Sequence, residues 1–96
     1  MPIAVHDLVI QPDQHTVYRG GEPIELSRTE FGLLSLLVGR PGQVLSRQDI
    51  LSGLYGNQHA VSDRAVDVQI VGLRRKLGPA GKYIETVRGM GYRFKE

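Results

Sequence analysis

Residues 62–94 read SDRAVDVQIVGLRRKLGPAGKYIETVRGMGYRF, and this stretch decides the fold. Its first half repeats apolar residues at the spacing of one helix face: Val66, Ile70, Leu73 and Leu77. Ser62 or Asp63 can cap such a helix at its start, and Gly78 followed by Pro79 ends it. The pattern therefore predicts a helix that ends near residue 77 and buries one face against a core.

The opposite face of this helix is found by placing successive residues about 100° apart. The positions on that face are Arg64, Val68, Val71, Gly72 and Arg75. Gln69 and Arg74 fall on opposite flanks. The helix is thus expected to present arginines and valines to solvent, with Val71 and Gly72 at the centre of the exposed face.

The second half of the stretch predicts a β-hairpin. Residues 83–87 and 92–94 alternate as strands do, and residues 88–91 between them include two glycines that can take the positive φ of a tight turn. Tyr92 and Phe94 share one face of this hairpin, while Arg93 and Lys95 share the other.

Two shorter helices precede the long one. Ser27 and Glu30 form a capping-box pattern that starts a helix over residues 28–39. Ser46 and Asp49 repeat the pattern in a weaker form and start a helix that ends at Gly56. Only a few residues join the two, as in a helix-turn-helix, and the added hairpin makes a winged helix.

Strand-like runs at residues 8–10, 15–18 and 24–26 predict a small antiparallel meander at the amino end. The expected fold class is therefore α+β: a winged helix-turn-helix with a small amino-terminal antiparallel sheet, three helices and a carboxy-terminal β-hairpin wing. A chain of 96 residues fits a single domain of this kind.

Composition excludes several classes of protein. The chain has no cysteine, which removes a disulfide framework, a thiolate nucleophile and the usual structural zinc site. Its start has no basic, apolar leader, and no apolar run is long enough to cross a bilayer. We expect a cytoplasmic protein with no membrane partner.

Charge is distributed unevenly along the chain. Residues 1–63 contain four basic and seven acidic residues, a net charge of −3, whereas residues 64–96 contain eight basic and three acidic residues, a net charge of +5. The basic residues fall on the long helix and the hairpin, which favours a polyanionic partner, although a solvated basic surface would have the same composition.

Other chemistries find no support in the residues. His6, His15 and His59 lack the spacing of metal ligands, and no glycine-rich nucleotide loop is present. Asp63 and Asp67 lie four residues apart, but a cap and a partner for Arg64 or a nearby arginine explain them better than acid–base catalysis. We predict no enzymatic activity, cofactor or metal.

Five segments carry a family resemblance: LSRTEF at 26–31, GQVLSR at 42–47, RAVDVQI at 64–70, LRRKL at 73–77 and TVRGMGYRF at 86–94. Together they resemble the OmpR/PhoB-type winged-helix effector domain of bacterial response regulators, over nearly the whole of residues 1–96. The resemblance implies a four-stranded amino-terminal sheet and sequence-specific binding to double-stranded DNA at promoter direct repeats, in a two-component phosphorelay. The family's receiver domain is absent from this chain, so we expect an excised domain or, alternatively, a free-standing relative.

The resemblance also implies roles for individual residues. The recognition helix 64–77 would enter the major groove, and the wing 83–95 would contact the minor groove or the backbone. Phosphate contacts are expected from Arg47, Tyr55, Arg64, Gln69 and Arg74. Base reading is expected from Val68, Val71, Arg75 and Arg88, and wing contacts from Thr86, Arg88 and Tyr92. Val71 and Gly72 stand where family members often carry basic or polar side chains that read bases, so DNA shape is expected to contribute to specificity here.

Further partners follow from the same resemblance. The loop at residues 56–61 matches a segment that contacts RNA polymerase in some members, and the full-length protein would have a receiver domain and a sensor kinase. The isolated domain is expected to be a monomer that binds DNA as a tandem dimer. The alternative from another class is a protein-docking module, since winged helices also serve that purpose.

Overall fold

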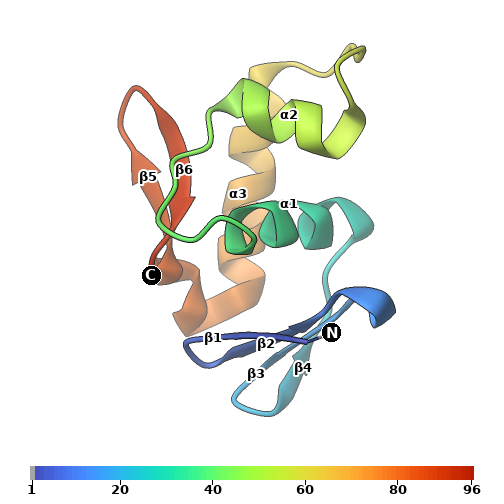
Figure 1. Cartoon of the computed structure of the whole chain (residues 1–96), viewed down its shortest axis with the longest axis vertical. Coiled ribbons are helices and arrows are strands. Elements are labelled where there is room, and N and C mark those ends of the chain that lie inside the picture. Colours follow the sequence, from blue (N-terminus) through green and yellow to red (C-terminus); the bar gives the residue numbers. More distant parts are fainter. Residues whose placement is uncertain (1) are drawn as a thin grey trace.

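The computed structural model describes residues 2–96 and contains two small sheets and three helices (Figure 1). The amino-terminal sheet lies at one end of the molecule, and the carboxy-terminal hairpin lies alongside the longest helix (Figure 1). This arrangement of sheet, three helices and hairpin confirms the expected winged helix-turn-helix of the α+β class.

The amino-terminal sheet has four antiparallel strands in sequence order. They are β1 (Ile3–Val5), β2 (Leu8–Gln11), β3 (Thr16–Arg19) and β4 (Glu22–Ile24). The residue pattern alone missed β1, because three residues are too few to show an alternation. It also placed β4 two residues late, since Leu26 lies beyond the strand in the segment that leads to the first helix. A short 3-10 helix, Pro12–Gln14, connects β2 to β3.

Both short helices begin with complete capping boxes. In α1 (Arg28–Val38), the Ser27 backbone N–H donates to Glu30 Oε1 at 2.8 Å and the Glu30 N–H donates to Ser27 Oγ at 3.1 Å. In α2 (Arg47–Tyr55), Ser46 and Asp49 form the same pair of hydrogen bonds, each at 3.0 Å. The second box is therefore as complete as the first.

The longest helix, α3 (Asp63–Leu77), begins at the N-cap Ser62 without a side-chain cap. Ser62 is thus the N-cap residue, one of the two predicted, although its side chain makes no capping hydrogen bond. Asp63 is the first residue of the helix, and its carboxylate accepts a hydrogen bond from the Gln48 amide of α2 at 2.6 Å. A 3-10 helix that the sequence pattern did not predict, Gly78–Tyr83, follows α3.

The wing consists of β5 (Ile84–Val87) and β6 (Gly91–Phe94). Tyr92 and Phe94, which were predicted to share one face of the hairpin, are both buried in the core. The segment before α2 adds a third strand position to this sheet, since the N–H of Leu45 donates to the Tyr92 carbonyl at 2.8 Å and the Tyr92 N–H donates to the Leu45 carbonyl at 2.9 Å. The wing is thereby attached to the connection between α1 and α2.

Gly91 allows this close approach. Its φ is +146°, and a Cβ built on it would collide with the Leu45 carbonyl. We expect Gly91→Ala to lower the free energy of unfolding by about 2 kcal/mol, because both the backbone and the Leu45 bridge must shift. Urea unfolding followed by circular dichroism measures this loss.

The matched control for that substitution is Gly89→Ala, in the turn that precedes β6. Gly89 also has a positive φ, +77°, but a Cβ there would meet nothing within 4 Å. Equal losses in the two variants would show that backbone conformation alone, and not the contact with Leu45, makes Gly91 necessary.

One continuous core joins the helices to both sheets. The predicted buried face of α3 is confirmed, since Val66, Ile70, Leu73 and Leu77 are each at most 2% exposed. These residues pack with Leu33 and Leu37 of α1 and with Phe94 of the wing within the same cluster. Burial of one face of α3 leaves its other face free.

Candidate nucleic-acid interface

The free face of α3 carries exposed arginines and valines. The side chains of Val68 and Val71 are 63% and 55% exposed, and both are among the most exposed large apolar residues of the described chain. Arg64 and Arg75 are exposed on the same face. Exposed valines in a helix that already buries another apolar face are not needed for the core, so they are candidates for contact with a partner.

Gly72 does not share this face, and its predicted position at the centre of the exposed surface is wrong. It is half-buried, and a Cβ built on it would lie 3.0 Å from Glu30 Oε2 at the start of α1. The reason is that α1 covers a wider part of α3 than the stripe of buried residues indicates. Lys76, one turn further along α3, forms an ion pair with the same Glu30 carboxylate at 2.6 Å.

Two predicted DNA contacts, Arg47 and Tyr92, lie around one aspartate, Asp67, that was not itself predicted as a contact. Asp67 Oδ1 accepts a hydrogen bond from Arg47 Nε at 2.8 Å and another from the Tyr92 hydroxyl at 2.5 Å. Hydrogen bonds from Arg47 and then Tyr92 hold the pKa of Asp67 below its ordinary value, while burial raises the pKa of Tyr92. Asp67 was expected to pair with Arg64 or a nearby arginine; its hydrogen-bonded arginine is instead Arg47 of α2, 20 residues away. The network joins α2, α3 and β6.

The lowered pKa of Asp67 predicts a pH-dependent stability. A carboxylate whose pKa is lower in the folded state stabilises the fold above the unfolded value, about 3.9 for aspartate, and this contribution is lost as the pH falls through the folded pKa. We therefore expect Asp67→Asn to be less stable than the parent at pH 7, with a difference that shrinks below about pH 4. Urea unfolding at pH 7, 4 and 3 measures it.

Asp63→Asn is the control, since Asp63 lies in the same helix but accepts its hydrogen bond from a neutral amide. A difference between Asp67→Asn and the parent that stays constant from pH 7 to pH 3 would contradict the ionic role of Asp67.

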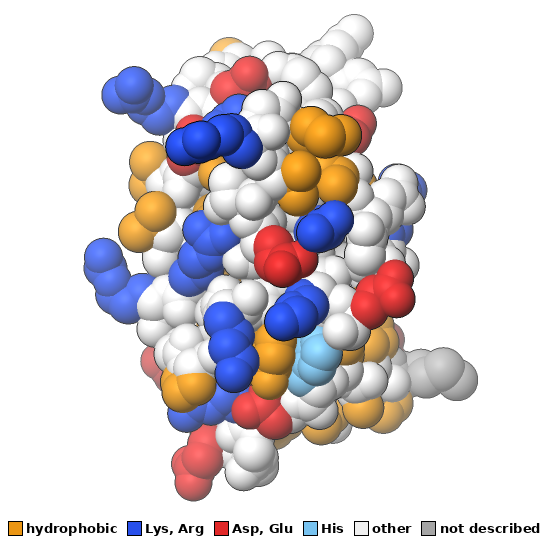
Figure 2. Space-filling model, turned by 90° about the vertical axis from the view of Figure 1, so that its left-hand side faces the viewer, with side chains coloured by type: hydrophobic (Ala, Val, Ile, Leu, Met, Phe, Trp, Pro, Cys, Tyr) orange, Lys and Arg blue, Asp and Glu red, His pale blue; other side chains and the backbone are white. Residues whose placement is uncertain are grey.

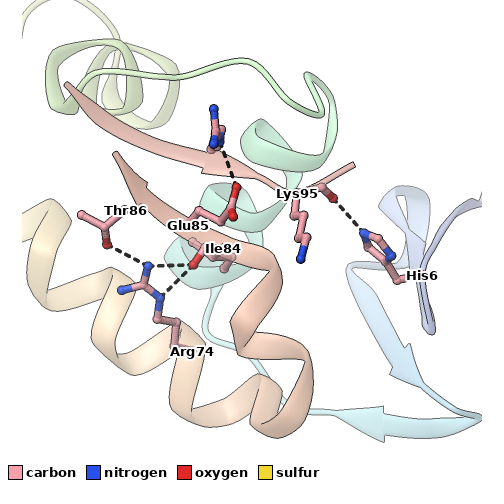
Figure 3. A network of polar contacts seen from close by, with 7 residues as sticks. His6, Arg74, Ile84, Glu85, Thr86 and Lys95 are labelled. Carbon is pink, nitrogen blue, oxygen red and sulfur yellow. Dashed lines mark hydrogen bonds and ion pairs between the residues drawn. The ribbon is translucent and has the colours of Figure 1, made fainter. Parts of the chain in front are cut away.

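Arg74 connects α3 directly to the wing. Its Nε and Nη2 donate to the Ile84 carbonyl at 3.1 and 2.7 Å, and Nη2 also donates to Thr86 Oγ1 at 2.9 Å (Figure 3). Its guanidinium carbon also lies 5.8 Å from the centroid of the Tyr92 ring. A predicted phosphate contact, Arg74, and a predicted wing contact, Thr86, are thus adjacent, and part of the Arg74 guanidinium group is occupied by the protein itself.

The remaining predicted contacts lie at the edges of this surface. Arg88 is exposed in the turn between β5 and β6, next to Met90, which is also exposed. Tyr55 is exposed at the end of α2, and Gln69 is half-buried on the flank of α3. Figure 2 shows Lys and Arg side chains spread over the side of the molecule that carries the wing, with hydrophobic side chains exposed between them.

The surface consists mainly of arginine side chains and exposed apolar side chains. Among residues 2–96, no three His, Cys, Asp or Glu side chains are grouped as a metal ion would require. His6 instead stacks on Tyr83 at 4.0 Å between ring centroids, with its Nε2 2.8 Å from the Lys95 carbonyl oxygen (Figure 3). No helix within residues 2–96 combines the length and apolar character needed to cross a membrane.

Sequence reasoning missed the contacts that hold this surface in place. Arg47 and Asp67 are 20 residues apart, and Glu30 and Lys76 are 46 residues apart. Periodicity reports only neighbours on the same element, so no pattern in the sequence could indicate these pairs.

Fold and surface together define a winged helix-turn-helix domain with an exposed third helix. The chain belongs to the family described as "Transcriptional regulatory protein, C terminal", which matches residues 21–94 and is the OmpR/PhoB type of effector domain. Its members are domains of transcription regulators rather than enzymes.

Two curated relatives and one solved structure illustrate the similarity. The chain is 41% identical to the phosphate regulon transcriptional regulatory protein PhoB of Escherichia coli over 97% of its own length and 44% of that protein. It is 42% identical to the response regulator MprA of Mycolicibacterium vanbaalenii over 94% of its length and 40% of that protein. The DNA-binding domain of Klebsiella pneumoniae RstA, solved in complex with the RstA box, matches with a TM-score of 0.87 and 38% identity, over 98% of this chain and 96% of that one. The chain thus spans less than half of the curated relatives.

Proposed function

We propose that this domain binds double-stranded promoter DNA sequence-specifically, as the output domain of a two-component transcription regulator. One observation carries the proposal: α3 exposes Arg64, Val68, Val71 and Arg75 beside a wing whose turn carries Arg88. An exposed helix fits the major groove, and an adjacent hairpin reaches the backbone or the minor groove. The similarity to an RstA domain solved with DNA supports the same use of the surface.

Roles can be assigned to the residues on this surface. Arg64 and Tyr55 would contact phosphates with exposed side chains, and Gln69 would do so from a half-buried position. Arg47 and Arg74 would do so from positions fixed by Asp67 and by the Ile84 carbonyl. Thr86, Arg88 and Tyr92 would form the wing contacts, and Val68, Val71 and Arg75 would face base edges; Gly72 would contribute no side chain.

The test is a selection from a pool of random duplex DNA, followed by sequencing of the bound fraction at two salt concentrations. We expect an enriched direct repeat, weakened by Arg64→Ala and by Arg88→Ala. Arg28→Ala is the control, because Arg28 is exposed but begins α1, which packs against the buried side of α3. No enrichment, with binding indifferent to Arg64 and Arg88, would contradict the proposal.

Salt dependence separates DNA binding from the alternative of a protein-docking module. If about five basic residues neutralise phosphates, the logarithm of the affinity falls with the logarithm of the salt concentration with a slope of about −4 to −5 per domain. Fluorescence anisotropy with a labelled duplex between 50 and 300 mM salt measures the slope. A slope near zero would favour docking.

The assembly on DNA would be a tandem dimer. The free domain would be a monomer, and two copies would bind half-sites about 10 base pairs apart, one turn of the duplex. Sedimentation with and without a duplex that carries two half-sites tests this, and a dimer without DNA would contradict it.

The full-length protein would have further partners. A receiver domain and a sensor kinase would control it by phosphorylation, in line with relatives that are more than twice as long as this chain. The exposed loop at residues 56–61 would contact RNA polymerase. Substitution of Asn57 and Gln58 by Ala in the full-length regulator should then reduce transcription without reducing DNA affinity.

A further inference from the structure

Thr86 and Tyr92 are cross-strand partners in the wing, and each has a hydroxyl group. Their exposure differs, since Tyr92 is only 5% exposed whereas Thr86 lies open to solvent. A hydroxyl group has a single proton to donate. The hydrogen bond that each hydroxyl forms within the protein therefore decides what it can still offer to DNA.

The proton of the Tyr92 hydroxyl is directed to Asp67. Hydrogen bonds from Arg47 and then Tyr92 hold the pKa of Asp67 below its ordinary value, and an ionised carboxylate only accepts. The 2.5 Å bond between the Tyr92 oxygen and Asp67 Oδ1 is therefore donated by Tyr92. Because phosphate oxygens also accept, the Tyr92 hydroxyl has no proton left for the DNA backbone.

The Thr86 hydroxyl is bonded in the opposite sense. The Arg74 guanidinium group has no acceptor atom, so its Nη2 donates to Thr86 Oγ1 at 2.9 Å and the threonine proton must point elsewhere. A charged donor on the oxygen polarises the hydroxyl group and strengthens the bond that its proton can form. Thr86 is thus oriented to donate to a phosphate.

Asp67 also fixes the position of Arg47. Its Oδ1 accepts from Arg47 Nε at 2.8 Å, and both side chains are 41% exposed. A guanidinium group has five N–H donors, and this bond uses one of them, so the outer end of Arg47 can still bind a phosphate. One carboxylate therefore orients the arginine and takes up the tyrosine proton.

We propose that Asp67 is a positioning residue of the DNA interface: it holds Arg47 toward a phosphate and engages the Tyr92 hydroxyl, so that Thr86 and not Tyr92 donates the wing's hydrogen bond to the backbone. This rests on the proposed function and refines the wing contacts given there. Tyr92 acts through Asp67 and contributes no hydrogen bond to DNA.

Removal of one hydroxyl group at a time tests the division between Thr86 and Tyr92. Thr86→Val should bind the duplex enriched in the selection about tenfold more weakly, the value of a hydrogen bond to a charged group. Tyr92→Phe should keep the affinity of the parent and lose stability instead, because Asp67 loses a partner. Anisotropy titration and urea unfolding measure the two quantities. An unchanged affinity in Thr86→Val together with a tenfold loss in Tyr92→Phe would overturn the assignment.

A double-mutant cycle tests the positioning of Arg47. Asp67→Asn should weaken DNA binding about threefold in the parent, within the usual coupling range of contacting residues, and should have no effect in Arg47→Ala. Asp63→Asn is the matched control, because it removes the same charge from α3 but a carboxylate that accepts from the neutral Gln48 amide. Its effect corrects each arm of the cycle for the change in net charge.

Equal effects of Asp67→Asn with and without Arg47 would overturn the positioning role, because a purely structural or repulsive carboxylate acts the same in both backgrounds. These outcomes leave DNA binding by the parent domain intact. A parent domain that binds no duplex would instead contradict the proposed function itself.

Discussion

The Val71→Glu variant is expected to bind DNA about 100-fold more weakly than the parent domain, with an unchanged melting temperature. A glutamate at the centre of the exposed face of α3 places a negative charge inside a groove bordered by phosphates, and like charges brought together at an interface cost several kcal/mol. Val71 is 55% exposed, so its replacement disturbs no core packing. Anisotropy titration and thermal unfolding measure the two quantities.

The matched control for this variant is Val9→Glu. Val9 is also an exposed valine, but it lies on β2, in the sheet at the other end of the molecule (Figure 1). It receives the same change of charge, so a comparable loss of affinity in both variants would show that net charge, and not position on α3, controls binding.

Phe94→Ala is expected to lower the free energy of unfolding by about 3–5 kcal/mol, the usual cost of removing a buried aromatic ring. The side chain is 0% exposed and belongs to the core cluster shared with α3. The total free energy of unfolding of a small domain is only about 5–15 kcal/mol, so the variant should be close to unfolded at 37 °C. Urea unfolding at 25 °C measures the loss.

Met90→Ala serves as the reference for Phe94→Ala, because Met90 is in the same hairpin but is 61% exposed. Its unfolding free energy should change by less than about 0.5 kcal/mol. Similar losses in the two variants would contradict the assignment of the wing to the core.

The helices were predictable because each has a start signal, a period and a stop signal in the sequence. The capping boxes at Ser27 and Ser46 predicted where α1 and α2 begin, and Gly78 predicted where α3 ends. The three-residue β1 and the 3-10 helix after α3 have no such signals. They form because the surrounding elements supply their partners, as when Ile3, Ala4 and Val5 pair with β2.

The candidate site was predictable in part for the same reason. The exposure of Val68 and Val71 follows from the period of α3, but the position of Gly72 does not, because it depends on how far α1 extends across that helix. The contacts of Arg47, Arg74 and Tyr92 depend on tertiary structure in the same way. Their roles on DNA are inferences from family resemblance.

The two backbone hydrogen bonds between Leu45 and Tyr92 restrict how the wing can move. Together with the hydrogen bonds from Arg74 to Ile84, they fix the hairpin to the rest of the domain at both of its strands. These bonds hold the strands of the wing at a defined place beside α3. A duplex that contacts both the wing and α3 would have to adjust its groove width to that spacing, and the energy of the adjustment would depend on the stiffness of the bases between the two points of contact. The domain would then bind less tightly to sequences whose deformation costs more free energy, a form of indirect readout.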